Sequence, residues 1–143
     1  MKATILVSTA LTLFTITNLF GQKTDEEKLV KEAISKFAKA ADERDEKALD
    51  EVLDNTFRLA LNQMFGGKDV SLMDKIGYLE RIREKKFGGD KREVTIENII
   101  IMNNNASARV TLKGTKFSLV TLLQLGKSSD GVWKIVNDMP SVL

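Results

Sequence analysis

The residues of this chain that could perform acid–base chemistry are carboxylates and a single tyrosine. The sequence has no histidine, the commonest general base, and no cysteine to act as a nucleophile. Asp54 and Asp138 are the candidate bases, and Tyr78 is the candidate hydrogen-bond donor. Catalysis needs a base and an acid with opposed environments in one cavity, and the sequence does not assure that pairing. Asp54 also has a simpler interpretation as a solvated helix-end residue, because aspartates often serve caps and turns.

A second set of residues has the types that line small-molecule pockets, which need mostly apolar walls and a few polar groups. The candidates are Phe37, Phe57, Leu61, Met64, Tyr78, Arg109 and Trp133. Trp133 could stack on a flat heterocycle, but a single aromatic residue on a strand with Ile135 on the same face usually packs in the core. A fully packed core uses the same residue types, so both interpretations stay open.

The charge composition is nearly balanced, with 22 basic and 20 acidic residues. This balance gives no electrostatic case for nucleic acid as a partner. The densest basic run, residues 81–86, is typical of a solvated helix end whose cations complement the helix dipole, and a phosphate or anionic-membrane site is the alternative. Without histidine or cysteine the commonest transition-metal ligands are missing, and we expect neither a metal nor a cofactor.

The N-terminus has the pattern of a cleavable secretory signal peptide. Lys2 precedes an uncharged run from Ala3 to Gly21, and Gly21 is a small residue suited to the position before a cleavage site. Hydroxyl and amide side chains dilute the run, which favours a signal peptide over a membrane anchor. We therefore expect residues 1–21 to be removed, leaving residues 22–143 as one secreted or periplasmic domain without a stable membrane anchor.

The first part of the mature chain has the spacing of helices. Residues 24–27 form a capping box, and the apolar stripe that follows predicts an amphipathic helix to about Arg44. Asp45 predicts the N-cap of a short second helix. Ser71 predicts the start of a third helix that ends at the glycines of residues 88–89. The inward positions of that helix are expected to be Leu72, Ile76, Leu79 and Ile82, with Tyr78 beside them.

Alternation of apolar and polar residues predicts strands in the rest of the chain. Residues 57–61 indicate a first strand, and after residue 92 four strands with short turns predict an antiparallel meander that ends at Pro140. Arg109 alternates with Ala108 and Val110, so it is either exposed or a cation in a pocket wall. Helices early and strands late indicate the α+β class, with the helices on one face of the sheet.

This order of elements resembles the nuclear transport factor 2-like (NTF2-like) superfamily over about residues 25–138. The matching passages are a long helix followed by a short one (residues 37–49), the entry into the first strand (54–59), and the C-terminal strand pair (119–123 and 131–137). The glycine turn followed by Trp-Lys-Ile-Val-Asn looks most like the putative lumazine-binding branch. The resemblance implies a cone-shaped, cystatin-like fold, with three N-terminal helices packed on a curved, mainly antiparallel sheet.

The resemblance leaves two functions open. We expect a non-catalytic, exported pocket protein that holds a small apolar or planar ligand. The alternative is an enzyme like the ketosteroid isomerases or polyketide cyclases of the superfamily, with a carboxylate base. Asp54 lies roughly where the isomerases place their base, whereas their tyrosine is usually on the first helix and Tyr78 is on the third. Relatives often pair through the sheet, and the strand around residues 119–123 is apolar on both faces, so a homodimer is also expected.

Overall fold

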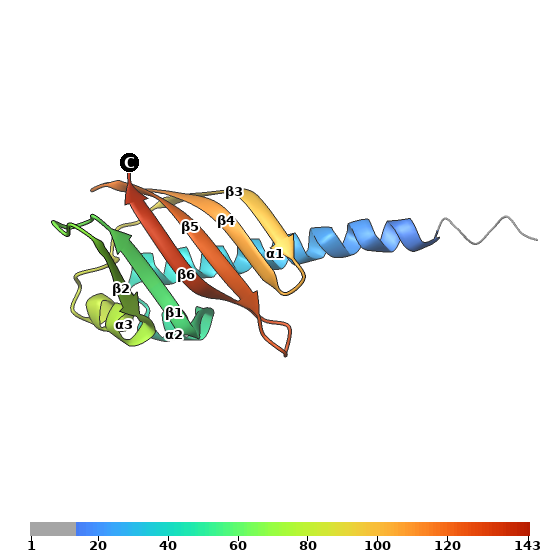
Figure 1. Ribbon diagram of the computed structural model, residues 1–143, viewed down its shortest axis with the longest axis horizontal. Helices are drawn as coiled ribbons and strands as arrows, with labels where there is room; N and C mark the ends of the chain where they lie inside the picture. The colour runs from blue at the N-terminus through green and yellow to red at the C-terminus, as the bar shows by residue number, and fades with distance from the viewer. Residues whose placement is uncertain (1–13) are drawn as a thin grey trace, which may run out of the picture.

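The structure is a computed structural model that describes residues 14–143. Within these residues, six strands form one sheet in the order β2-β1-β6-β5-β4-β3, and helices cover one of its faces (Figure 1). The elements are α1 (Phe14–Glu43), α2 (Glu46–Val52), β1 (Leu53–Asn62), β2 (Val70–Asp74), α3 (Lys75–Arg83), β3 (Glu93–Met102), β4 (Asn105–Lys113), β5 (Ser118–Lys127) and β6 (Trp133–Val142). The predicted α+β class is confirmed. The predicted signal peptide, residues 1–21, lies mainly outside the described residues and stays a prediction.

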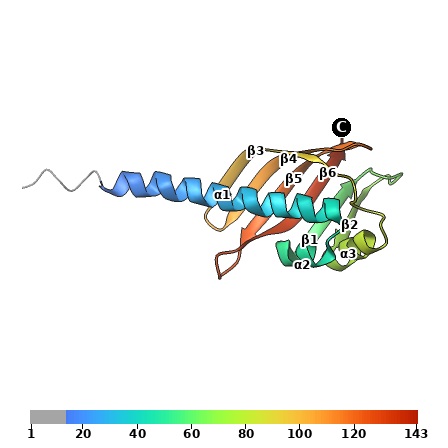
Figure 2. The same ribbon diagram turned by 180° about the vertical axis from the view of Figure 1, so that it is seen from behind.

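The long helix α1 crosses the covered face of the sheet (Figure 2). Its buried side chains, among them Val30, Ile34, Phe37 and Ala41, recur every three or four residues and therefore share one face. The helix runs without a break through residues 24–27, so the predicted capping box does not mark its start. With helix on both sides of this position, no unpaired backbone amides are left there for the box to cap.

Asp45 separates α1 from α2 as predicted. Its side chain accepts a hydrogen bond from the backbone amide of Ala48 at 3.0 Å, which makes it the N-cap of α2. Arg44 ends α1 in the left-handed conformation, with a φ of 55°, and the next amide returns to the carbonyl of Ala40 at 2.9 Å. The two helices are thus joined by a sharp turn with a basic residue in the position that glycine usually takes.

The third helix begins later than Ser71, where the sequence predicted it. Residues Val70–Asp74 form strand β2, antiparallel to β1, and α3 starts only at Lys75. Leu72 is consequently 68% exposed on the strand, and Ile76 is 69% exposed in the first turn of the helix, so neither points inward as predicted. A short run of apolar residues can match the spacing of either a helix or a strand. Here the pairing with β1 makes the segment a strand.

The end of α3 also differs from the predicted glycine cap at residues 88–89. The helix ends in a Schellman motif, in which the amide of Lys86 donates to the carbonyl of Arg81 at 2.9 Å and the amide of Lys85 donates to that of Ile82 at 3.0 Å. Lys85 has a φ of 61°, the left-handed conformation that glycine adopts most easily. A lysine therefore closes the helix.

The glycines that follow allow the loop of residues 84–92 to pass close to the end of α1. Gly88 has a φ of 66°, and a Cβ atom on it would lie 2.1 Å from the carbonyl oxygen of Ala41. The amide of Gly89 donates to the same oxygen at 3.2 Å. From α1, the guanidinium of Arg44 donates to the carbonyls of Phe87 and Gly88, each at 3.0 Å. The loop is thus fastened to the helix by both backbone and side chain.

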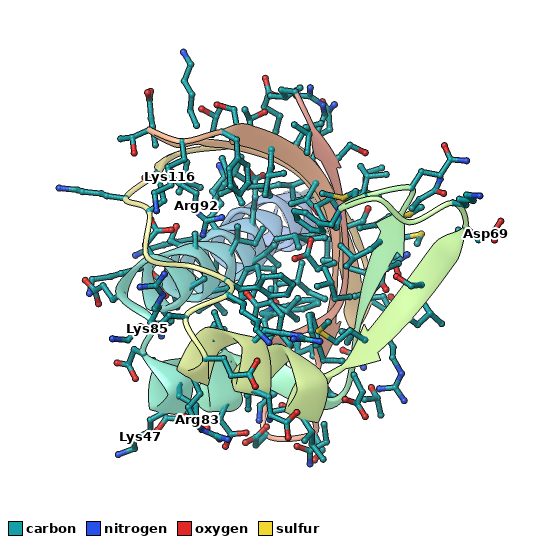
Figure 3. The ribbon with its side chains drawn as sticks, turned by 90° about the vertical axis from the view of Figure 1, so that its left-hand side faces the viewer. Lys47, Asp69, Arg83, Lys85, Arg92 and Lys116 are labelled. Carbon is teal, nitrogen blue, oxygen red and sulfur yellow. The ribbon has the colours of Figure 1, made fainter. Side chains whose placement is uncertain are left out.

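Strands β3 to β6 form the predicted antiparallel meander. Strand β4 alternates most regularly, with Ala106, Ala108, Val110 and Leu112 buried against the helices. Together with α1, α2 and α3 these strands enclose one hydrophobic core on the covered face. The six strands curve around α1 when seen along the helix (Figure 3).

Strand β6 departs from the prediction in two respects. Consecutive residues of β5 pair with Ile135 and Asn137, so Val136 is an extra residue that forms a β-bulge. The strand then continues through Pro140, where the sequence predicted its end. Its pairing with β1 stops at Asp138, so Pro140 has only β5 beside it and its missing amide is tolerated.

Candidate functional site

A cavity of about 320 Å³ opens between the covered face of the sheet, α1 and the loop of residues 84–92. Ligand sites in proteins commonly range from about 300 to 1,000 Å³, so this one is large enough for a small organic molecule. Most of its wall is apolar, and the apolar lining residues are Phe37, Ala41, Leu59, Leu61, Met64, Phe65, Phe87, Leu112, Phe117, Leu119 and Pro140. They come from α1, from β1, β4, β5 and β6, and from the loops beside them.

Two buried polar side chains, Asp138 and Thr121, belong to the same wall. They lie on the neighbouring strands β6 and β5, and the Thr121 hydroxyl donates a hydrogen bond to the Asp138 carboxylate. Burial raises the pKa of Asp138 to about 6, although the bond from Thr121 and the positive charge of Arg92 oppose the change. The bulge at Val136 explains the inward direction of Asp138, because it reverses which residues of β6 face the core.

Tyr78 is the third polar group in the wall, and aromatic rings surround it. Its ring centroid lies 5.5 Å from that of Phe57, 5.9 Å from that of Phe87 and 6.3 Å from that of Phe37. Burial, and then the negative charge of Asp138, raise the pKa of Tyr78 well above its usual value. The hydroxyl therefore stays protonated, and it shares one cavity with a carboxylate.

Cations surround the mouth of the cavity. Lys85 and Lys86 follow α3, Lys116 lies in the loop between β4 and β5, and Arg44 ends α1. Arg92 lies further in, where it forms a largely buried ion pair of 2.5 Å with Asp42 of α1. Figure 3 looks onto this end of the molecule, where Lys116, Arg92 and Lys85 lie on the same side. The cavity therefore has mostly apolar walls, a carboxylate in its wall and cations at its mouth.

Comparison with protein families identifies the domain. The family model described as "Putative lumazine-binding" matches residues 25–140, which is most of the chain. The chain belongs to the putative lumazine-binding family. No curated protein sequence is significantly similar to it.

Solved structures share the fold of this lumazine-binding-family domain at low sequence identity. An NTF2-like protein of unknown function from Silicibacter pomeroyi superimposes with a TM-score of 0.74 at 11% identity, covering 85% of this chain and 98% of its own. One from Methylobacillus flagellatus has a TM-score of 0.69 at 22% identity, covering 83% and 93%. A putative ketosteroid isomerase from Shewanella frigidimarina has a TM-score of 0.58 at 14% identity, covering 79% and 94%. These similarities confirm the predicted NTF2-like, cystatin-like fold.

The structure brings several of the sequence-predicted site residues together in the cavity of this family member. Phe37, Leu61, Met64, Tyr78 and Asp138 all line it. Phe57 is fully buried behind the wall, where its ring packs edge-on against Tyr78. The candidate acid–base pair in this cavity is therefore Asp138 with Tyr78.

The other three predicted residues lie elsewhere in the lumazine-binding-family domain. Asp54 begins β1, and its carboxylate accepts hydrogen bonds from the amide and hydroxyl of Thr56 at 2.8 and 2.7 Å. Arg109 lies on the uncovered face of the sheet in an ion pair of 2.5 Å with Glu97. Trp133 is buried against α1, and its indole N–H donates to the carboxylate of Glu26 at 2.9 Å. None of the three lines the cavity.

Sequence reasoning missed Thr121, Arg44 and Lys116, and it named Lys85 and Lys86 only as part of a basic run for which an anion site was the alternative interpretation. Thr121 carried a usable signal, because it is the polar residue in a row with the buried Leu123 and Leu125 of the same strand. The basic run of residues 81–86 was a signal for Lys85, but nothing in the sequence indicated that Lys116 lines the same cavity, because the two loops are distant in sequence. Among the residues that the structure describes, no group of three His, Cys, Asp or Glu residues is arranged to hold a metal ion. Nor does a helix in that part of the chain combine the length and apolarity needed to cross a membrane.

Proposed function

We propose that this protein binds a small, largely apolar or planar molecule in the cavity and does not transform it. The observation that carries the proposal is a cavity of about 320 Å³ with apolar walls and only a few polar groups. The name of the family points in the same direction, because a lumazine is a planar heterocycle. The ring of Tyr78 and the Asp138–Thr121 pair would contact and orient such a ligand.

Native mass spectrometry of the purified protein tests this proposal, by detecting small molecules that co-purify with it. Leu61→Trp would fill part of the cavity, since Leu61 lines it and is only partly exposed. Leu72→Trp is the matched control, because Leu72 lies exposed on β2 outside the cavity. We expect a bound molecule in the wild type and the control but not in Leu61→Trp. Equal retention by both variants would contradict binding in this cavity.

A second candidate function is proton transfer next to a carbonyl group. One specific observation favours it, namely that Asp138 and Tyr78 line the same cavity and that the charge of Asp138 acts on Tyr78. Asp138, with a pKa of about 6, would take the proton from carbon, and the Tyr78 hydroxyl would donate a hydrogen bond to the developing enolate oxygen. The structural neighbour from Shewanella frigidimarina carries the name of such an isomerase.

Turnover of a panel of unsaturated ketones distinguishes the two candidates. If the protein is an isomerase, Asp138→Asn and Tyr78→Phe should each abolish or strongly reduce turnover, while Asp54→Asn should have no effect because Asp54 lies outside the cavity. Circular dichroism of each variant would show that it is folded. Turnover by the wild type that depends on Asp138 would exclude the non-catalytic proposal.

We also propose that the protein is exported and that residues 1–21 are removed. The support is the sequence pattern of Lys2, the uncharged run and Gly21. The capping box at residues 24–27 gains a role in this proposal, because it would cap the new start of α1. Intact-mass measurement on periplasmic or secreted material should give a chain that begins at Gln22, and a chain that begins at Met1 would contradict export with cleavage.

A homodimer through the sheet is the final part of the proposal. The helices of the described chain all lie on one face of the sheet (Figures 1 and 2). The other face carries exposed apolar side chains. Leu122 and Met139 are paired across β5 and β6 there and are 58% and 40% exposed. A second copy would cover them. Light scattering at micromolar concentration should give the mass of a dimer, and Leu122→Asp should give that of a monomer.

A further inference from the structure

The side chains that line the cavity include more cations than carboxylates. Five cationic side chains and two carboxylates line it. Both carboxylates already accept hydrogen bonds from other groups of the protein. Asp138 accepts from Thr121, and Asp90 accepts from the amide and hydroxyl of Thr115 at 2.9 and 2.5 Å and from the amide of Lys116 at 3.2 Å. The charges of Asp90 and Lys116 interact, but with five cations against two carboxylates the cavity's own acids offset only part of the positive charge at the mouth.

The cations differ in the partners that they have. Arg92 is paired with Asp42, and Lys86 lies 2.8 Å from a carboxylate oxygen of Glu84. The ammonium groups of Lys85 and Lys116 form no ion pair or hydrogen bond with the described residues, and both side chains are exposed at the mouth. These two ammonium groups come from different loops that line the same cavity, and they are free to bind an anion.

The backbone around Lys85 is an independent sign that the lysine has a role. Its left-handed φ of 61° is a conformation that is less favourable for a residue with a side chain than for glycine. The peptide is held there by the Schellman motif and by Arg44, whose guanidinium donates to the carbonyl of Lys85 at 3.2 Å. Arg44 itself has a φ of 55° at the end of α1. Both helix ends at the mouth thus carry a cation where glycine would be easier to accommodate.

From these observations we infer that the ligand is an amphipathic anion, whose apolar body fills the cavity and whose carboxylate lies at the mouth between Lys85 and Lys116. This inference rests on the proposed function and names its substrate class. Apolar walls exclude a small hydrophilic anion, because it would lose its hydration without replacement. The cations at the mouth favour an acid over the matching alcohol or amine, because a charged donor strengthens a hydrogen bond to an anion.

Isothermal titration calorimetry with matched probes tests the charge of the ligand. Decanoate, 1-decanol and decylammonium share one flexible body, and 2-naphthoate and 2-naphthalenemethanol share one planar body. We expect at least one of the two acids to bind at least about tenfold more tightly than its alcohol, and decylammonium to bind most weakly. The preference for the acid should shrink at high salt, since the mouth is solvated.

Substitutions at the mouth assign the preference to the two lysines. Lys85→Gln combined with Lys116→Gln should reduce the affinity for the acid by about tenfold or more and leave that for the alcohol unchanged. The control combines Lys28→Gln with Lys47→Gln, two exposed lysines that do not line the cavity. Lys85→Gly is a further variant that should fold at least as stably as the wild type, since glycine suits the left-handed φ, and should still lose affinity for the acid.

The outcomes separate the inference from the proposed function. Equal binding of an acid and its alcohol would overturn the anionic ligand and leave the binding function intact. An unchanged preference in the double variant would overturn the role of Lys85 and Lys116. Failure of every probe to bind, together with the absence of any co-purifying molecule, would overturn the binding function and the inference with it.

Discussion

Asp138 is a carboxylate buried beside Thr121 without an ion pair among the described residues. Burial stabilises its protonated form, so the native state holds a proton that the unfolded chain releases at lower pH. Between the ordinary pKa of 3.8 and the native value of about 6, the native state binds more protons than the unfolded state. The free energy of unfolding therefore falls as the pH rises through this window, and it stays lower at every higher pH.

We predict that Asp138→Asn removes this pH dependence. The ionised carboxylate costs up to about 3 kcal/mol of unfolding free energy at neutral pH, from a difference of about two pH units at 1.36 kcal/mol each. Urea unfolding at pH 4.5 and at pH 7.5 measures the effect. Relative to the wild type, the variant should gain stability between the two pH values, because it has no proton to lose. Comparing the two proteins cancels the other carboxylates, several of which have lowered pKa values and act in the opposite direction. A constant difference at both pH values would contradict the raised pKa.

Lys75 is a buried cation that joins three elements at one point. Its ammonium group donates to the carbonyls of Asp50 and Leu53 at 2.7 and 3.0 Å and lies 2.9 Å from the carboxylate of Asp50. We predict that Lys75→Met lowers the unfolding free energy by about 1–3 kcal/mol, because it leaves these carbonyls without their donor. Lys47→Met on the exposed side of α2 is the control, and thermal melts of both variants provide the measurement. Equal melting temperatures would show that Lys75 contributes nothing.

At the scale of elements, the sequence predicted the parts whose pattern is long and regular. The buried face of α1, the N-cap at Asp45 and the alternation of β4 could all be read from spacing, since each depends on neighbours within the same element. Strand β2 and the length of β6 could not. Val70–Asp74 becomes a strand because β1 lies beside it, and Pro140 is tolerated because β1 no longer does.

The candidate site shows the same limit. Alternation from Trp133 and Ile135 assigns Asp138 to the outer face, and only the extra residue Val136 turns it inward. A bulge depends on the partner strand, so the side chains of β6 beyond it could not be assigned from spacing. Tyr78 was placed beside the inward positions of the third helix from their spacing, but its full burial in an aromatic cluster follows from the start of α3 at Lys75.

The contact between the loop of residues 84–92 and α1 gives a prediction with a matched control. Gly88→Ala places a Cβ atom 2.1 Å from the carbonyl oxygen of Ala41, and Gly66→Ala has a similar φ of 84° with nothing within 4 Å. We expect Gly66→Ala to cost about 1 kcal/mol for its backbone conformation, and Gly88→Ala to cost clearly more and to loosen the loop. Urea unfolding compares the stabilities, and proteolysis at Lys85 and Lys86 reports on the loop. Equal losses of unfolding free energy in the two variants would show that the close contact between Gly88 and Ala41 does not contribute to stability.

At the scale of the whole molecule, α1 connects the two ends of the domain. At one end Arg44 holds the loop at the cavity mouth. Toward the other end, the carboxylate of Glu26 accepts hydrogen bonds from the indole of Trp133 at 2.9 Å and from Lys127 at 2.6 Å. The pKa of Glu26 is lowered by these bonds, first by that from Lys127 and then by that from Trp133. The helix therefore contributes contacts to the domain from about residue 26 onward.

Two shortened chains test how much of α1 the domain needs. A protein that begins at Gln22 should melt at the temperature of the full chain, because it keeps Glu26 and all of the α1 side chains that the structure describes as buried. A protein that begins at Lys28 loses Glu26 and should melt at a lower temperature, since Trp133 and Lys127 lose their acceptor. Glu26→Gln in the longer chain separates the loss of charge from the loss of helix. Identical melting temperatures of the two shortened chains would show that the contacts of Glu26 do not contribute to stability.

The position of β6 has a consequence for the order in which the protein folds. The last strand of the chain lies between β1 and β5, so the first two strands cannot join the other three until the final ten or so residues are available. Pairings between segments so distant in sequence form slowly, because a long loop must close before they contribute. We therefore expect the chain to stay incompletely folded during synthesis until β6 is available to pair with both β1 and β5. That delay would suit a chain that crosses a membrane before it folds, and it makes the last strand the step that completes the cavity.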